Sequence, residues 1–420
     1  MEINSSVLAN GLRILSVSRP ETETVSVGIW VNTGSAYERK EVNGVSHFVE
    51  HMVFKGTAKR NALQISEDIE NVGGQTNAYT SREFTVFYAK MLKNDLELAV
   101  DVLADLVVAP TFNADEMAKE KEVVIQEIKQ TNDDPSDVVF DYFQQTAFDK
   151  QPLGMSILGP EATIRSFNSE TLFNYMQSNY AAENIVVSAV GNLDHQKFVN
   201  MVENRMSNLQ KKVSFVPEQQ VYTGGEFIKQ RDTEQTHILL GFPGLKYQDE
   251  KYYHATILST ILGGSMSSRL FQEIREKRGL VYTVYSFANS YTNNGSFGIY
   301  AGLNAEEIKN YISVVGEELK KISNEYVTDK ELNRVKVQLK SSILMALESS
   351  SSTAEINARQ HLIHKRNIPI NEIVSRIDSV SKQDVQNMAR QIFSGKLAYT
   401  LLGDTKDCPQ YADVQKYLQI

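Results

Sequence analysis

Residues 47–51 read His-Phe-Val-Glu-His and bring together three side chains that could do chemistry. Two imidazoles four residues apart on a helix lie on one face, so His47 and His51 can bind one metal ion together. Glu50 lies near the same face, three residues after His47. A carboxylate beside a metal-bound water can take its proton and later deliver it to a leaving amine. The pattern therefore predicts a hydrolytic metal centre, and chance is an uncommon explanation in a chain with seven histidines.

A third protein ligand is needed, because catalytic zinc sites usually combine three side chains with one water. Residues Ala114–Gln130 predict a helix on which Glu120 and Glu127, seven positions apart, share a face. Val123 and Val124 predict that this face is partly buried, where a carboxylate needs a partner. One carboxylate could bind the ion and the other could orient a histidine. An ordinary charged helix surface is the alternative, and the spacing does not decide between them.

The elements that must position these residues follow from apolar periodicity and turn residues. Gly44 and Ser46 suit a turn and an N-cap before the histidine helix. Strands come partly in consecutive pairs, which favours an α+β fold with mostly antiparallel sheets backed by helices. In the first half, strands are predicted at Arg13–Ser18, Val25–Asn32, Gln75–Ser81 and Thr85–Met91, and helices at Ser46–Val53, Leu63–Val72, Asn94–Val107 and Ala114–Gln130.

The chain reads as two copies of one unit, which internal similarity at a fixed offset indicates. Gly28 and Gly241 are 213 positions apart (241 − 28), and Gly191 and Gly403 are 212 apart (403 − 191), each in an apolar run typical of a buried strand. A proline and a Gly-Gly pair mark a linker between the copies. We therefore predict a catalytic zinc-binding half at 1–210, a linker at 211–225 and a second half without metal at 226–420.

Length and composition indicate a globular protein of more than one domain. The 420 residues exceed one ordinary hydrophobic core, and 41% hydrophobic with 23% charged residues is a normal globular balance. The formal charge of −9 argues against a nucleic-acid partner and is compatible with basic peptide substrates.

Cellular location is suggested by what the sequence lacks. Cys408 is the one cysteine, so no intrachain disulfide can form and a reducing compartment is expected. No apolar run approaches the ~20 residues of a membrane-spanning helix. The start, Met1-Glu2-Ile3, resembles neither a secretory signal nor a transit peptide, so we expect a cytoplasmic protein without a membrane span.

With these residues in place, the chain resembles the pitrilysin-like inverzincin metallopeptidases, whose signature is His-x-x-Glu-His. It is most similar to the mitochondrial-type processing peptidase β subunit and its short bacterial relatives. In that family a ligand glutamate follows the signature by about 76 positions, and Glu127 follows His51 by 76 (127 − 51). The resemblance implies that His47, His51 and Glu127 bind one Zn²⁺ per chain and that Glu50 is the general base. It also implies that Glu120 is a second acidic residue of the catalytic machinery.

The resemblance further implies two homologous α+β halves that close like a clamshell around a chamber, with metal in the first half only. Asn77 and Ala78 match an edge strand whose backbone pairs with an extended substrate, a mode of binding with little sequence demand. Phe48 is implied to line the pocket beyond the cleaved bond. Arg275 and Tyr282 match a pair that reaches the substrate and stabilises developing negative charge.

Asp137 and Asp141, four positions apart, match the acidic pair with which processing peptidases bind an arginine near the cleaved bond. A solvated acidic segment is the alternative reading of these two residues. We therefore expect a processing-type zinc endopeptidase acting on extended, often basic peptides, and a homodimer. The alternatives are a general oligopeptide-degrading peptidase and a non-catalytic partner subunit, which the intact His-x-x-Glu-His and Glu127 disfavour.

Overall fold

The structure is a computed structural model that describes residues 2–212 and 219–418. Residues 213–218, part of the predicted linker, lie outside the described residues. The chain forms two compact units: the first comprises residues 1–129, 156–218 and 344–367, and the second residues 130–155, 219–343 and 368–420. Within the described ranges, no helix combines the length and apolar character needed to cross a bilayer.

The first unit is built on a mixed sheet whose described strands are ordered β1-β2-β6-β3-β5-β4. β2 and β6 run parallel, whereas all other neighbours are antiparallel. β4 stands at the end of this order, so one of its edges has no strand partner among the described residues. The strands are β1 (Asn4–Val7), β2 (Arg13–Ser18), β3 (Thr24–Val31), β4 (Gln75–Thr80), β5 (Thr85–Leu92) and β6 (Ile185–Gly191).

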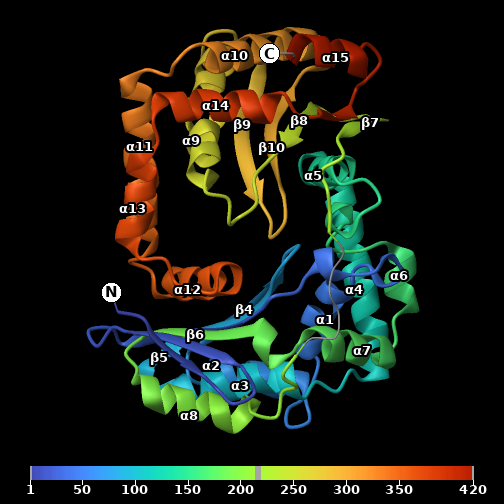
Figure 1. The fold of residues 1–420 in the computed structure, drawn as a ribbon. Helices are drawn as coiled ribbons and strands as arrows, with labels where there is room; N and C mark the ends of the chain where they lie inside the picture. The colour runs from blue at the N-terminus through green and yellow to red at the C-terminus, as the bar shows by residue number, and fades with distance from the viewer. Residues whose placement is uncertain (1, 213–218, 419–420) are drawn as a thin grey trace. The chain divides into compact units, whose positions relative to one another are not determined.

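Helices cover both faces of this sheet, which explains why β3 and β6 are apolar and buried along almost their whole length. On one face lies the larger core of the unit, and on the other lies α12 (Ser350–His364) over β3 and β6 (Figure 1). The helices on the larger core's side are α1 (Val45–Val53), α2 (Ala62–Glu70), α3 (Leu96–Val108), α4 (Ala114–Asp133), α6 (Glu161–Ser166), α7 (Ser169–Asn179) and α8 (His195–Met206).

The second unit repeats this plan with a sheet ordered β7-β11-β8-β10-β9, again with one parallel pair among the described strands, β7 with β11. Its strands are β7 (Gly225–Gln230), β8 (Thr236–Pro243), β9 (Val281–Ser290), β10 (Gly295–Leu303) and β11 (Ala398–Gly403). Its helices are α5 (Pro135–Ala147), α9 (Tyr252–Gly263), α10 (Ile308–Asn324), α11 (Asp329–Ala346), α13 (Ile370–Ser379), α14 (Lys382–Phe393) and α15 (Tyr411–Leu418).

The predicted fold class is confirmed: two homologous α+β halves carry mostly antiparallel sheets backed by helices. The glycines that suggested the repeat occupy equivalent places, because Gly191 ends β6 and Gly403 ends β11. Both have positive φ, 146° and 139°, and a Cβ on either would meet the first residues of the neighbouring strand. A conformation that favours glycine thus recurs in both halves.

The two units exchange one helix each, which no sequence pattern indicated. α5 follows α4 in the first sequence half but packs on β8 and β11, and α12 comes from the second half but packs on β3 and β6. The strands covered are equivalent in the two sheets. The predicted boundaries at 210 and 226 follow the repeat in sequence, whereas the compact units also include these exchanged helices.

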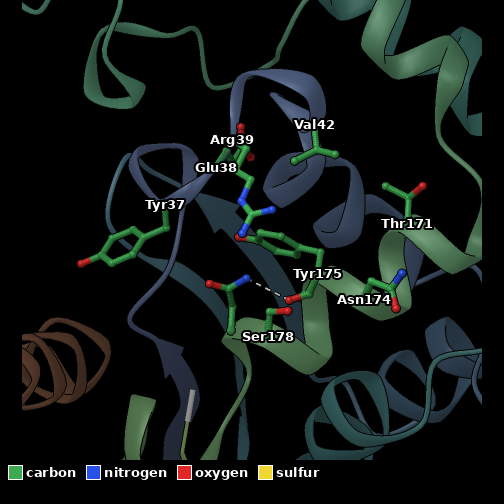
Figure 2. Close-up of a pocket in the computed structure, with 9 residues that line it drawn as sticks. Tyr37, Glu38, Arg39, Val42, Thr171, Asn174, Tyr175 and Ser178 are labelled. Carbon is green, nitrogen blue, oxygen red and sulfur yellow. Dashed lines mark hydrogen bonds between the residues drawn. The ribbon is translucent and has the colours of Figure 1, made fainter. Parts of the chain in front are cut away.

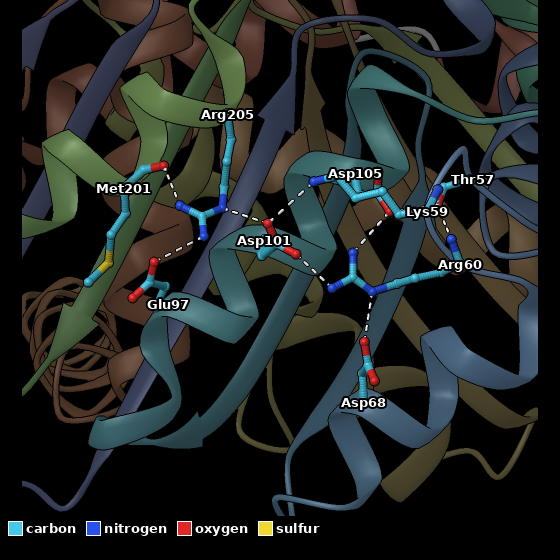
Figure 3. A network of polar contacts seen from close by, with 9 residues as sticks. All are labelled: Thr57, Lys59, Arg60, Asp68, Glu97, Asp101, Asp105, Met201 and Arg205. Carbon is cyan, nitrogen blue, oxygen red and sulfur yellow. Dashed lines mark hydrogen bonds and ion pairs between the residues drawn. The ribbon is translucent and has the colours of Figure 1, made fainter.

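The segment that follows α1 is anchored by a network of ion pairs (Figure 3). Arg60 contacts Asp68 of α2 at 2.7 Å, and Asp101 and Asp105 of α3 at 2.6 and 3.0 Å. Arg205 of α8 contacts Asp101 at 2.8 Å. The side chain of Asp105 is only 2% exposed, and a buried carboxylate of this kind needs a partner, which Arg60 provides. The network therefore fixes the loop after the histidine helix to three other helices.

We predict that Arg60→Met lowers the free energy of unfolding by roughly 3 kcal/mol, because it leaves the buried carboxylate of Asp105 without its cation. Lys59→Met is the matched control, since the Lys59 side chain is 60% exposed and lies 3.5 Å from Asp101. It should cost less than about 1 kcal/mol. Urea unfolding followed by circular dichroism measures both, and equal losses for the two variants would contradict the prediction.

Candidate metal centre

Helix α1 begins at a buried carboxylate. Gly44 takes the N-cap position with φ of 95°, a conformation that favours glycine. Glu38 accepts hydrogen bonds from the backbone amides of Gly44 (2.7 Å) and Ser46 (2.8 Å), which satisfies amides that the helix start leaves open. Burial raises the pKa of Glu38 to about 6. The predicted cap at Ser46 is wrong, because Ser46 lies inside the helix and its hydroxyl is hydrogen bonded to that of Tyr175 (2.6 Å).

A cavity of about 370 Å³ borders on this helix start and is shown in Figure 2. The Asn179 amide donates to the backbone carbonyl of Tyr175 at 2.9 Å, so both residues of α7 are fixed where they line the cavity. The complete lining is Tyr37, Glu38, Arg39, Val42, Thr171, Asn174, Tyr175, Ser178 and Asn179. The predicted metal ligands are not part of this lining, so the cavity is separate from the candidate metal centre.

The three predicted metal ligands converge on one point from two helices. His47 and His51 lie on α1 and Glu127 on α4, and one ligand atom of each lies within 4.8 Å of the others. Glu127 Oε2 is 3.7 Å from His47 Nε2 and 3.4 Å from His51 Nε2. Ligands bound at 2.0–2.1 Å to a tetrahedral zinc ion are about 3.4 Å apart. The Glu127 oxygen therefore lies about as far from each imidazole nitrogen as such an ion requires.

Glu120, also on α4, fixes the orientation of His51. Its Oε1 accepts a hydrogen bond from His51 Nδ1 at 2.8 Å, and its Oε2 pairs with Lys55 Nζ at 2.8 Å. Burial opposes ionisation of Glu120, but the bonds to His51 and Lys55 outweigh it and lower the pKa of Glu120. An ionised carboxylate only accepts, so Nδ1 of His51 carries the proton and Nε2 presents a lone pair to the metal position.

The two histidines differ in their protonation. Burial lowers the pKa of His47 to about 3, and the nearby His51 adds to this. Burial would also lower the pKa of His51, but the hydrogen bond to Glu120 and the charges of Glu127 and Glu50 outweigh it and raise the pKa. Without a metal, His47 is therefore neutral at neutral pH, whereas His51 holds a proton more tightly than an ordinary histidine.

Glu50 lies beside the three predicted ligand residues but outside the group that they form. Its Oε2 accepts a hydrogen bond from the Thr80 hydroxyl of β4 at 2.6 Å. Burial raises the pKa of Glu50. The hydrogen bond from Thr80 and the nearby His51 oppose this shift, whereas the charge of Glu127 reinforces it. A carboxylate with a raised pKa next to a metal position suits proton transfer near neutral pH.

Two expectations about neighbouring side chains need correction. Val124 is buried on α4 as predicted, but Val123 is 45% exposed and does not share the buried face. The family resemblance places Phe48 in a substrate pocket, yet Phe48 is fully buried and packs on Phe167 with ring centroids 5.6 Å apart. Phe48 follows His47 by one residue, so the helix turns it by about 100° from His47 into the larger core.

The predicted substrate strand is an edge strand in the structure. Asn77 and Ala78 lie on β4, at the end of the sheet order. The Asn77 side-chain oxygen accepts a hydrogen bond from the Ala78 amide at 2.8 Å. Asn77 therefore satisfies an amide of the edge strand in the absence of a further strand.

The remaining predicted contacts belong to the second unit. Arg275 lies over the ring of Phe271 at 4.8 Å, and Tyr282 on β9 is 58% exposed. Asp137 and Asp141 lie one turn apart on α5. Burial raises the pKa of Tyr285, and the nearby Asp137 raises it further. A role of these four residues in binding substrate at the metal centre stays a prediction.

Sequence reasoning missed three residues that support the centre: Lys55, Thr80 and Glu38. Lys55 follows His51 by one helical turn, and Thr80 lies three residues after Asn77 in the predicted strand, so both had a positional signal. Glu38 had none, because a charged residue in a loop is normally exposed. Its role depends on how the loop folds back onto the start of α1.

Comparisons with known proteins show the family and the fold of this chain. Residues 13–161 match the family model described as Insulinase (Peptidase family M16), and residues 166–339 match the Peptidase M16 inactive domain. Solved structures share the fold: a protease from Helicobacter pylori has a TM-score of 0.88 at 22% identity, covering 96% of this chain and 99% of that one. A peptidase M16 inactive domain from Pseudomonas fluorescens has a TM-score of 0.90 at 21% identity, with 96% and 99% covered.

Curated relatives align over almost the whole chain. An uncharacterized zinc protease of Bacillus subtilis is 38% identical over 95% of this chain and 98% of its own length. One from Rickettsia felis is also 38% identical, over 95% and 97%. A probable β subunit of the mitochondrial-processing peptidase of Arabidopsis thaliana is 32% identical over 98% of this chain and 80% of its own. Matched by both family models and by relatives of this similarity, the chain belongs to peptidase family M16.

Proposed function

We propose that this protein is a zinc-dependent endopeptidase of extended peptides, with one Zn²⁺ held by His47, His51 and Glu127 and with Glu50 as general base. The observation that carries the proposal is the position of Glu127 Oε2, 3.4 and 3.7 Å from the two histidine Nε2 atoms. Two imidazoles and one carboxylate form a donor set typical of catalytic zinc, which keeps a fourth position for water. Relatives named zinc proteases support the same metal.

When bound, the zinc ion supplies a Lewis acid that polarises the substrate carbonyl and acidifies a bound water. Glu50 takes the proton of the attacking water and delivers it to the leaving amine nitrogen. Glu120 holds His51 in the tautomer that leaves Nε2 free, and Lys55 balances the charge of Glu120.

An extended peptide is the substrate form that the first unit supports best. The free edge of β4 offers backbone groups to a further strand, and Asn77 and Ala78 lie on that strand. Such pairing gives affinity with little demand on the substrate sequence. We further propose that Asp137 and Asp141 select peptides with an arginine near the cleaved bond, and that Arg275 and Tyr282 contact the substrate; these roles rest on the family resemblance. General oligopeptide degradation is the alternative.

Metal analysis and cleavage mapping test the proposal together. Purified protein should contain one zinc per chain by inductively coupled plasma mass spectrometry, and it should cut a mixed peptide library at internal bonds. Enrichment of arginine near the cut would support a processing enzyme, and its absence would favour the general degrader. Protein that keeps no divalent ion after zinc loading and cuts no peptide would refute the proposal and favour a non-catalytic partner subunit.

The assembly state is proposed on the resemblance alone. An active half and an inert half within one chain make a homodimer the expected form. Light scattering coupled to size-exclusion chromatography would give twice the chain mass of 47.3 kDa for a dimer.

Zinc affinity should depend on pH through one histidine. His47, with a pKa of about 3, is already neutral at pH 5, whereas the raised pKa of His51 keeps it protonated there. Zinc binding must displace that proton, so the apparent affinity should rise by about tenfold per pH unit below the His51 pKa. Competition with a chelator between pH 5 and 7 measures the slope. Release of two protons per zinc ion, or of none, would contradict the assignment of His51 as the one ligand that must lose a proton.

A further inference from the structure

Glu50 is held by a side chain of the edge strand. Its Oε2 lies 2.6 Å from the Thr80 hydroxyl, the short distance typical of a hydroxyl that donates to a carboxylate. Thr80 is the last residue of β4 and pairs with Thr85 of β5. A glutamate has three rotatable side-chain bonds, so α1 alone does not fix the position of its carboxylate. Among the described residues, no hydrogen bond is made to Glu50 Oε1, which leaves that oxygen for proton transfer.

The end of β4 that carries Thr80 is itself fixed on both faces. Neighbouring residues of a strand point to opposite faces, and the Tyr79 hydroxyl donates to Glu355 of α12 at 2.9 Å. The next residue, Thr80, contacts Glu50 of α1. Because threonine is branched at Cβ, its χ1 angle is restricted and its hydroxyl direction follows the strand backbone. The position of the Glu50 carboxylate is thereby set by β4.

We infer that Thr80 is a positioning residue, whose hydroxyl fixes the general base Glu50 relative to a peptide bound along β4. The inference rests on the proposed function and deepens it. A peptide added to the free edge of β4 takes its register from that strand, and Glu50 takes its position from the same strand through Thr80. The scissile bond and the base are thus placed by one element. Catalytic groups tolerate an error of only about 0.5 Å, so losing this contact lowers turnover.

Thr80→Val tests this by replacing the hydroxyl with a methyl group while keeping the branched shape. In the zinc-loaded protein, kcat should fall by about tenfold, the effect typical of a lost supporting contact, while KM and zinc content stay unchanged. Thr80→Ser keeps the hydroxyl and should restore most of kcat. The matched control is Thr22→Val, which removes a hydroxyl bonded only to backbone carbonyls of Arg19 and Thr24.

A binding measurement separates positioning of the base from shaping of the strand. Zinc-free wild type and Thr80→Val should bind a fluorescein-labelled substrate peptide with equal affinity by fluorescence anisotropy. Weaker binding by the variant, or failure of Thr80→Ser to restore kcat, would overturn the inference. If the wild type cleaves peptides and Thr80→Val matches its kcat, the inference alone fails. If the wild type cleaves none, the proposed function fails and takes the inference with it.

Discussion

Replacing Glu50 by glutamine is expected to lower kcat by roughly 10³-fold while the protein keeps its zinc. A general base contributes about 10²- to 10⁴-fold to such reactions, and an amide cannot accept the proton of the attacking water. The side-chain oxygen of the introduced glutamine can still accept the hydrogen bond that Thr80 gives to Glu50, so the local structure should persist. Zinc content by mass spectrometry and turnover of a fluorogenic peptide measure the two effects on the same sample.

Glu67→Gln is the matched control for this change, since Glu67 is exposed on α2 in the same unit. It should leave both turnover and zinc content at wild-type values. An active Glu50→Gln variant would refute the assigned base, whereas an inactive variant without zinc would show that Glu50 takes part in metal binding. Only loss of turnover with full zinc content agrees with the geometry, in which Glu50 lies outside the ligand group.

Glu127→Ala is expected to weaken zinc binding by more than about 100-fold, beyond the loss seen when a group that merely supports a ligand is removed. Its Oε2 is the only carboxylate oxygen among the described residues that completes the ligand group with His47 and His51. At free zinc about 100 times Kd, binding stabilises the folded state by about 2.7 kcal/mol, and the variant should lose this gain. Thermal unfolding with and without zinc measures the loss.

The control for Glu127→Ala is Glu122→Ala on the same helix. Glu122 is 59% exposed and pairs with Arg165 at 2.7 Å on the surface, so zinc should still raise the melting temperature of this variant. If zinc stabilised the Glu127→Ala variant as much as wild type, the third ligand would have to be another residue. Glu120 would then be the first candidate, since it already contacts His51.

The proximity of His47, His51 and Glu50 could be predicted from sequence because the α-helix is a local structure. Its period of 3.6 residues puts His47 and His51 on one face and Glu50 near them, whatever the rest of the chain does. The same logic predicts a common face for Glu120 and Glu127 on α4. It does not decide which carboxylate binds the ion, and only the family spacing favours Glu127. In the structure, Glu120 contacts Nδ1 of His51, whereas Glu127 faces both Nε2 atoms.

Contacts between distant segments were beyond sequence reasoning. α5 and α12 each pack on the sheet of the unit whose sequence half they do not come from. This exchange depends on contacts with strands far away in the sequence, which the residues of either helix do not indicate. The family resemblance implies that Phe48 lines a substrate pocket, but the larger core encloses it. Glu38 looks like a surface charge, but its loop places it under the start of α1.

The fold class, the repeat and the helix that carries His47 and His51 were readable from the order of residues alone, because periodicity and spacing along one element are enough to specify them. Three contacts became visible only in the folded chain: Glu127 lies next to His51 Nε2, Lys55 pairs with Glu120, and Thr80 donates a hydrogen bond to Glu50. Each of these depends on the distance and direction between side chains of different elements. Packing of the whole unit sets such distances, and no local pattern encodes them.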